Sequence, residues 1–170
     1  MNDAVPASEV AWQALPERSR TLFLLAGGLP MLVLGTAAGA GLGLVLGTVL
    51  EDIGPVVLVP LAAVALGLLL GALGTWLGAK QYRHTRWLLD AHGLAVRRGR
   101  LWHRETRVPL TRVQHLDVKR GPLQRRRDLA TLVVHTAGTA NSAVAVPNLD
   151  AGDAEHLREQ LGRQIDRDDD

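Results

Sequence analysis

Two long apolar runs without a charged residue limit what this chain can fold into. The first extends from Leu22 to Leu50, 29 residues, and the second from Ile53 to Ala79, 27 residues. A helix needs about 20 apolar residues to cross a hydrocarbon core of roughly 30 Å. Core helices of soluble bundles normally keep a polar stripe, which both runs lack. We therefore predict two transmembrane helices, at about 22–50 and 53–79, after an N-terminal tail of residues 1–21.

The flanks of these runs predict a topology. Only Glu51 and Asp52 separate the runs, so the helices must form an antiparallel hairpin with both flanks on one side of the membrane. Basic residues in short flanks favour the cytoplasm, and both flanks are basic (Arg18, Arg20, Lys80, Arg83 and Arg86). We expect a multi-pass protein of the cell (inner) membrane, with its N- and C-termini in the cytoplasm and an acidic tip outside.

Glycines recur along both apolar runs at the spacing of a helix face. They are Gly35, Gly39, Gly43 and Gly47 in the first run, and Gly67, Gly71, Gly74 and Gly78 in the second. Small residues at such intervals let helix backbones approach closely in lipid. The pattern indicates helix packing, either of the hairpin on itself or between two copies of the chain. Neither run contains the intramembrane charge that marks ion pathways, so a channel or transporter is not expected.

Aromatic residues lie near the predicted membrane boundaries. Trp12 precedes the first run, and Trp76, Tyr82 and Trp87 surround the end of the second. Such amphipathic rings are enriched at membrane–water interfaces. We expect these four residues to form an interfacial belt, although each could equally be a packing residue.

The pattern after the second run changes to short strands separated by turns. The predicted strands are 86–90, 93–98, 101–108, 113–120, 129–136 and 142–146, with one helical turn at 123–128. Asp150 can cap a final helix at about 150–165, whose stripe of Ala154, Leu157, Leu161 and Ile165 needs a sheet to cover. One sheet of six or seven strands closed by this helix is the simplest arrangement. Residues 166–170 form an acidic tail.

Four segments of this region carry a family resemblance. They are Gly99–Trp102, Val108–Val118, Gly121–Leu123 and Leu129–Gly138. With two preceding spans, the chain resembles the bacterial pleckstrin-homology-like membrane proteins of the YdbS type. The resemblance implies a β-roll with a C-terminal capping helix at residues 85–165, held at the cell membrane. The family tends to have glycine before the leucine that opens the long strand, where this chain has Asp128.

The resemblance implies no catalytic activity and no cofactor, and the residues agree. Cysteine is absent, and no phosphate loop, paired-histidine helix or nucleophile elbow is present. His103, Glu105, His115 and Asp117 could neighbour one another across strands, but cross-strand polar residues are the better interpretation than a metal or acid–base site. We therefore expect a protein that is not an enzyme, with no bound metal.

Charge is concentrated in the middle of the chain. Residues 80–149 carry a net charge of +10, although the whole chain carries only +2. The candidate lipid- or partner-binding residues are Arg97, Arg98, Arg100, Arg125, Arg126 and Arg127. Each basic residue near an anionic leaflet contributes about 1 kcal/mol. The alternative is that these arginines are solvated surface residues, and without a recognition helix nucleic acid is not an expected partner.

Two functions follow as expectations. The first is a non-enzymatic membrane-anchored adaptor or scaffold, whose cytoplasmic domain docks a protein partner or its own copies, in envelope maintenance or stress. The second is a module that senses anionic phospholipid headgroups at the inner leaflet. Both make the lipid bilayer a partner of the chain.

Overall fold

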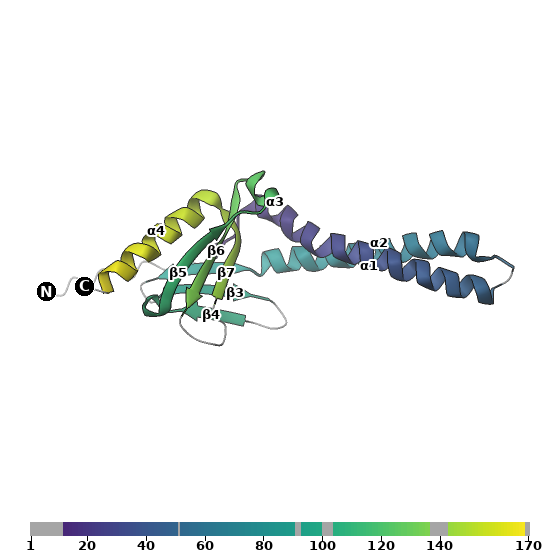
Figure 1. The fold of residues 1–170 in the computed structure, drawn as a ribbon, viewed down its shortest axis with the longest axis horizontal. Coiled ribbons are helices and arrows are strands. Elements are labelled where there is room, and N and C mark those ends of the chain that lie inside the picture. Colours follow the sequence, from purple (N-terminus) through teal and green to yellow (C-terminus); the bar gives the residue numbers. More distant parts are fainter. Residues whose placement is uncertain (1–11, 51, 91–92, 100–103, 137–142, 169–170) are drawn as a thin grey trace. The chain divides into compact units, whose positions relative to one another are not determined.

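The computed structural model describes residues 12–50, 52–90, 93–99, 104–136 and 143–168, with side chains as far as Arg163 in the last helix. The chain forms two compact units. One is a helical hairpin of residues 20–82, and the other, the β unit, combines the described residues up to Ser19 with those from Arg83 onward. Figure 1 shows the helices and strands of each unit.

Helix α1 (Arg20–Val49) and helix α2 (Pro55–Arg83) form the hairpin unit. The sequence placed these helices at 22–50 and 53–79, and the differences have local causes. Gly54 has a φ of +69°, which is not helical, and Pro55 suits the first position of a helix. Beyond Ala79 no glycine or proline interrupts α2, so the helix continues through polar residues to Arg83.

The hairpin distributes its side chains in the opposite way to a soluble bundle. The buried residues of α1 beyond Phe23 are all glycines, as are all the buried residues of α2. Large apolar side chains point outward instead, among them Leu29, Leu44 and Leu68. Both helices are long and apolar enough to cross a membrane. A surface of leucine and valine over an interior of glycine requires lipid as the solvent.

The glycines of α1 that recur every four residues, Gly35 to Gly47, lie against the backbone of α2. A Cβ atom added at Gly35 would lie 2.6 Å from the carbonyl oxygen of Leu66, and one at Gly39 would overlap the carbonyl of Ala62. Gly43 and Gly47 face Leu58 and Pro55 in the same way, and from α2 Gly67 faces Thr36 and Gly71 faces Leu32. The predicted glycine ridges are therefore the contact between the two helices of one chain.

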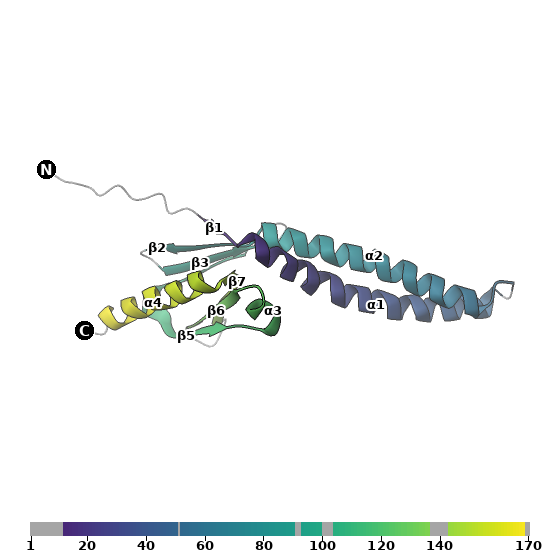
Figure 2. The same ribbon diagram turned by 90° about the horizontal axis from the view of Figure 1, so that it is seen from above.

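The β unit contains two antiparallel sheets. The first has the order β1 (Gln13–Ala14), β2 (Arg86–Asp90), β3 (Gly93–Arg98), β4 (Arg104–Val108), and the second has the order β5 (Val113–Lys119), β6 (Leu129–Thr136), β7 (Ala143–Asp150). The single sheet expected from the sequence is therefore wrong. Pro109 and the 3₁₀ turn Leu110–Arg112 redirect the chain after β4, so β5 starts a new sheet (Figures 1 and 2).

Strand β1 lies in the segment that the sequence assigned to an N-terminal tail. Gln13 pairs with Trp87 and Ala14 with Arg86, and the following Leu15 is buried. Two residues are too few to show an alternating pattern, so this strand could not be predicted from the sequence.

The aromatic residues do not form one interfacial belt. Trp87 is buried in β2, and the ring of Trp12 lies 4.6 Å from the guanidinium carbon of Arg97. Both therefore belong to the packing of the β unit. Trp76 is exposed on α2, with the ammonium group of Lys80 3.5 Å from the centre of its ring.

Helix α4 (Ala151–Asp168) is the C-terminal helix predicted at about 150–165, and it closes the second of the two sheets. Ala154, Leu157 and Leu161 are buried, and the helix contacts all three strands of that sheet. Its N-terminus is capped, because the backbone N–H of Gly152 donates to Asp150 Oδ1 at 3.1 Å. Ile165, the last residue of the predicted stripe, lies beyond the described side chains.

Candidate functional site

A short basic loop joins β5 to β6. We call residues 120–128 the α3 loop, after helix α3 (Pro122–Arg125). The side-chain amide of Gln124 fixes this loop: its Nε2 donates to Thr131 Oγ1 at 2.8 Å and to Asn148 Oδ1 at 2.7 Å, and its Oε1 accepts from the Gly121 N–H at 2.9 Å. The loop is therefore attached to β6 and β7 before any ligand is present.

The α3 loop presents Leu123 and several cations to solvent, and Arg120, Pro122 and Asp128 are exposed on it as well. Leu123 is 53% exposed, and Arg125, Arg126 and Arg127 are all exposed. An exposed leucine beside arginines suits a surface that is anionic outside and apolar just beneath, because the leucine can enter the apolar layer while the arginines stay at the charged boundary.

Asp128 ends the α3 loop in a conformation that glycine adopts most easily. Its φ is +52°, in the left-handed region, and its carbonyl oxygen accepts the N–H of Ala151 at 3.1 Å. Aspartate tolerates this region better than most residues. The turn where the family tends to have glycine therefore keeps its left-handed geometry in this chain.

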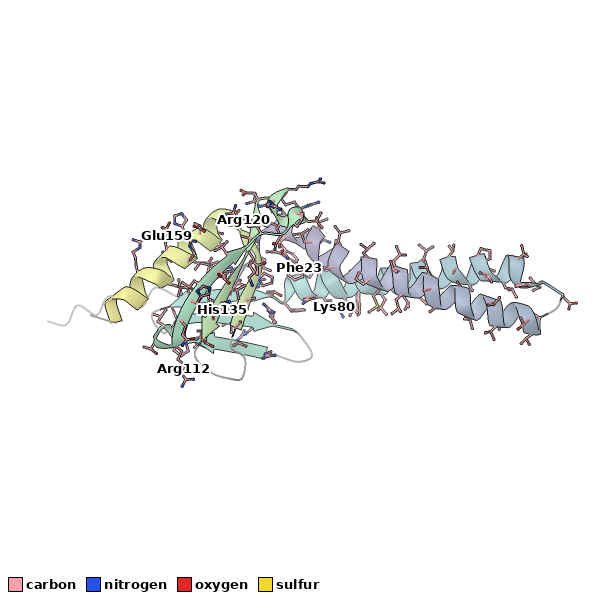
Figure 3. All side chains as sticks on the ribbon, viewed as in Figure 1. Phe23, Lys80, Arg112, Arg120, His135 and Glu159 are labelled. Atoms are coloured by element: carbon pink, nitrogen blue, oxygen red, sulfur yellow. The ribbon has the colours of Figure 1, made fainter. Side chains whose placement is uncertain are left out.

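The α3 loop lies at the end of the β unit where the chain continues into α1. Leu129, directly after the loop, pairs with Asp150, and Asp150 forms an ion pair with Arg18. Arg18 is two residues before the first residue of α1. Figure 3 shows Arg120 beside α3 and Arg112 at the opposite end of β5.

Two further candidate arginines, Arg97 and Arg98, lie on β3 and contact other residues of the β unit. Arg97 pairs with Glu105 at 3.0 Å. Arg98 donates to the carbonyl oxygen of Ala145 on β7, and burial, followed by the charge of Arg104, lowers the pKa of Arg98. Arg100 lies outside the described residues. The five described arginines of the six named from the sequence thus lie in two separate places, Arg97 and Arg98 on β3 and the other three on the α3 loop.

A cavity of about 300 Å³ lies beside Arg98, between β3, β4 and β7. Arg98 and Arg104 supply its charge, and Val96, Thr106 and Val144 line it further. Two guanidinium groups close enough to lower a pKa favour an anionic occupant, which would relieve their repulsion.

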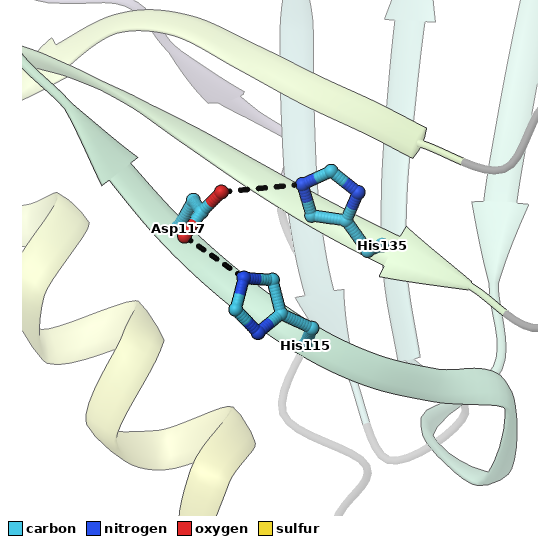
Figure 4. A group of neighbouring side chains, drawn as sticks. All are labelled: His115, Asp117 and His135. Carbon is cyan, nitrogen blue, oxygen red and sulfur yellow. Dashed lines mark ion pairs between the residues drawn. The ribbon is translucent and has the colours of Figure 1, made fainter.

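The four polar residues considered from the sequence do not form one cluster among the described residues. Glu105 is on β4 in the first sheet, whereas His115 and Asp117 are on β5 in the second, and His103 lies outside the described residues. Asp117 instead lies between His115 and His135 (Figure 4). His135 was missed because only the register of β5 with β6 brings it to His115.

Comparison with known proteins identifies the class. The profile of the bacterial PH domain family matches residues 29–165, more than half of the chain, so the chain belongs to this family. It is 33% identical over 97 residues to the transmembrane protein YdbS of Bacillus subtilis (strain 168), a match that covers 56% of this chain. That match spans 59% of YdbS, less than two thirds of its length. No solved structure matches. The chain is thus a membrane protein with a bacterial PH-like domain.

Proposed function

We propose that the chain is a non-enzymatic membrane-anchored module whose PH-like domain binds anionic lipid headgroups through the α3 loop. The observation that carries this proposal is the preformed loop itself. Gln124 fixes it through three hydrogen bonds, and it presents Leu123 between exposed cations. Because the loop needs little ordering on binding, most of its attraction for the membrane is retained as affinity.

The position of the loop supports this function. The Arg18–Asp150 ion pair connects the strands at the C-terminal end of the loop to the segment that precedes the apolar part of α1. Arg18 is two residues from α1 along the chain, and electrostatic attraction acts within a Debye length of about 8 Å at physiological salt. The basic flanks of the antiparallel hairpin favour the cytoplasmic side, where the leaflet is anionic.

Substituting both Arg125 and Arg126 with glutamine should release the α3 loop from anionic membranes. The loss of two charges corresponds to about 2 kcal/mol, or roughly a 30-fold lower equilibrium constant for docking. Hydrogen–deuterium exchange of the full chain in nanodiscs measures this as amide protection in residues 119–129. Protection is expected with phosphatidylglycerol and not with phosphatidylcholine alone.

Arg112→Gln is the matched control, since Arg112 is exposed at the far end of β5. It should leave the protection unchanged, while 1 M salt, with a Debye length of about 3 Å, should remove it. Equal protection in both lipids would contradict the proposal. So would cleavage of the loop by trypsin added outside intact cells, because the loop would then face away from the inner leaflet.

A second function, a protein adaptor, is favoured by the cavity beside Arg98 and Arg104. Its charge suits an acidic segment of a protein partner, or of a second copy of the chain, laid along β7. A photoreactive residue in place of Thr106 should then crosslink one defined protein in cells, and Arg104→Glu should reduce that product at least 10-fold. A photoreactive residue at Arg112 is the control. The same adducts from both positions would count against a docking site here.

A further inference from the structure

The register of β5 with β6 brings two histidines and a carboxylate together on one face of the second sheet. His115 and His135 are direct cross-strand partners, and Asp117 follows His115 by two positions on β5. Residues two apart on a strand point to the same face. All three side chains therefore converge, as Figure 4 shows.

The nitrogen atoms of both rings point at the same carboxylate. The Nε2 atom of His115 lies 3.0 Å from Asp117 Oδ1, and that of His135 lies 3.3 Å from Asp117 Oδ2. One ligand atom from each of the three residues can be chosen so that all lie within 4.8 Å of one another. Ligands about 2.0–2.1 Å from a tetrahedral zinc ion are about 3.3 Å apart. Each histidine already lies at about this distance from one oxygen of Asp117, although from different oxygens, so a shift of these side chains within the 4.8 Å group would complete the ligand set.

The Nε2 atom of His135 is the second observation that points to a ligand. It is buried and makes no hydrogen bond within the part of the chain that the structure describes. Its contact with Asp117 Oδ2 at 3.3 Å lacks hydrogen-bond geometry, and a bound cation would give this buried nitrogen a well-oriented partner and recover free energy. His115 is 63% exposed at its side chain, so an ion can reach the group from solvent.

We propose that His115, Asp117 and His135 bind a divalent transition-metal ion, with Zn²⁺ as the best fit. Two imidazoles and one carboxylate are a donor set of zinc, whereas Ca²⁺ and Mg²⁺ prefer oxygen ligands. Three protein ligands leave a fourth position for water or for an atom of a partner. The ion links β5 to β6 at a site separate from the α3 loop, so the inference does not depend on the proposed lipid binding.

Tag-free full-length protein in detergent micelles, treated with a chelator and dialysed, tests the site. Titration with Zn²⁺ against a chromogenic chelator should give one ion per chain. Asp117→Asn, His115→Ala and His135→Ala should each weaken binding at least 10-fold. The protein loaded with Co²⁺ in place of Zn²⁺ should show the visible absorption of a low-symmetry Co²⁺ site. Acidification should release the bound ion, because a protonated imidazole cannot ligate a metal.

His156→Ala is the matched control, because His156 is exposed on α4 and outside the group. It should bind Zn²⁺ as the unaltered protein does, and circular dichroism should show that all four variants are folded. Folded variants that bind Zn²⁺ with unchanged affinity would overturn the proposal. Binding that His156→Ala weakens as much as His135→Ala would also overturn it, since that result indicates scattered surface histidines.

Discussion

Replacing Gly39 by valine should separate α1 from α2 and destabilise the hairpin by about 1–3 kcal/mol or more, the usual range for overpacking. A Cβ atom at Gly39 would overlap the carbonyl of Ala62 and lie 2.7 Å from the Cα atom of Ala63. Both are backbone atoms, so no change of rotamer can make room. The helices themselves must move apart.

Gly41→Val is the matched control on the same helix. A Cβ atom at Gly41 meets nothing within 4 Å, because this glycine faces outward. The two variants add the same side chain to the same helix and differ only in the face that carries it. Equal disruption by both would mean that helix propensity, and not the contact between α1 and α2, determines the result.

Spin labels can measure the separation directly, since the chain contains no cysteine. Leu29→Cys on α1 and Leu73→Cys on α2 replace exposed side chains, so labels there should not disturb the contact. Double electron–electron resonance in nanodiscs should give one narrow distribution of label-to-label distances when the labelled protein carries Gly41→Val. The Gly39→Val background should give a broader distribution shifted to longer distances.

Leu161→Ala should destabilise the β unit by about 2–5 kcal/mol, the range for truncation of a fully buried leucine. Leu161 has no exposed surface and lies on the face of α4 that covers the second sheet. The substitution removes three carbon atoms from a fully buried position, and the surrounding structure relaxes only partly to fill the space. The cavity left behind adds to the loss of buried apolar area.

Urea unfolding of the full chain in micelles, followed by tryptophan fluorescence, measures this change. Trp87 is buried in β2 and reports on the β unit. Gln160→Ala is the control, because Gln160 is exposed on the same turn of α4. A midpoint for Leu161→Ala that equals the midpoint for Gln160→Ala would show that α4 contributes little to the stability of this unit.

The sequence was sufficient wherever a property depends on residues close together in the chain. The absence of charge in two runs indicated the spans, and the spacing of glycines indicated the face on which α1 meets α2. Strands 86–90, 93–98 and 129–136 were predicted with the bounds that the structure has. The cap at Asp150 and the stripe through Leu161 were likewise visible, because capping and amphipathic periodicity are local.

Tertiary structure alone decided what depends on register and on contacts between distant segments. Pairing of Gln13 with Trp87 turned part of an apparent tail into strand β1. Of the candidate arginines that the structure describes, Arg97 and Arg98 lie on β3 and contact Glu105 and Ala145, and the other three lie exposed on the α3 loop, because these placements cannot be read from spacing. His135 met His115 only through the alignment of β5 with β6. A shift of one residue in that register would place one of the two rings on the opposite face of the sheet.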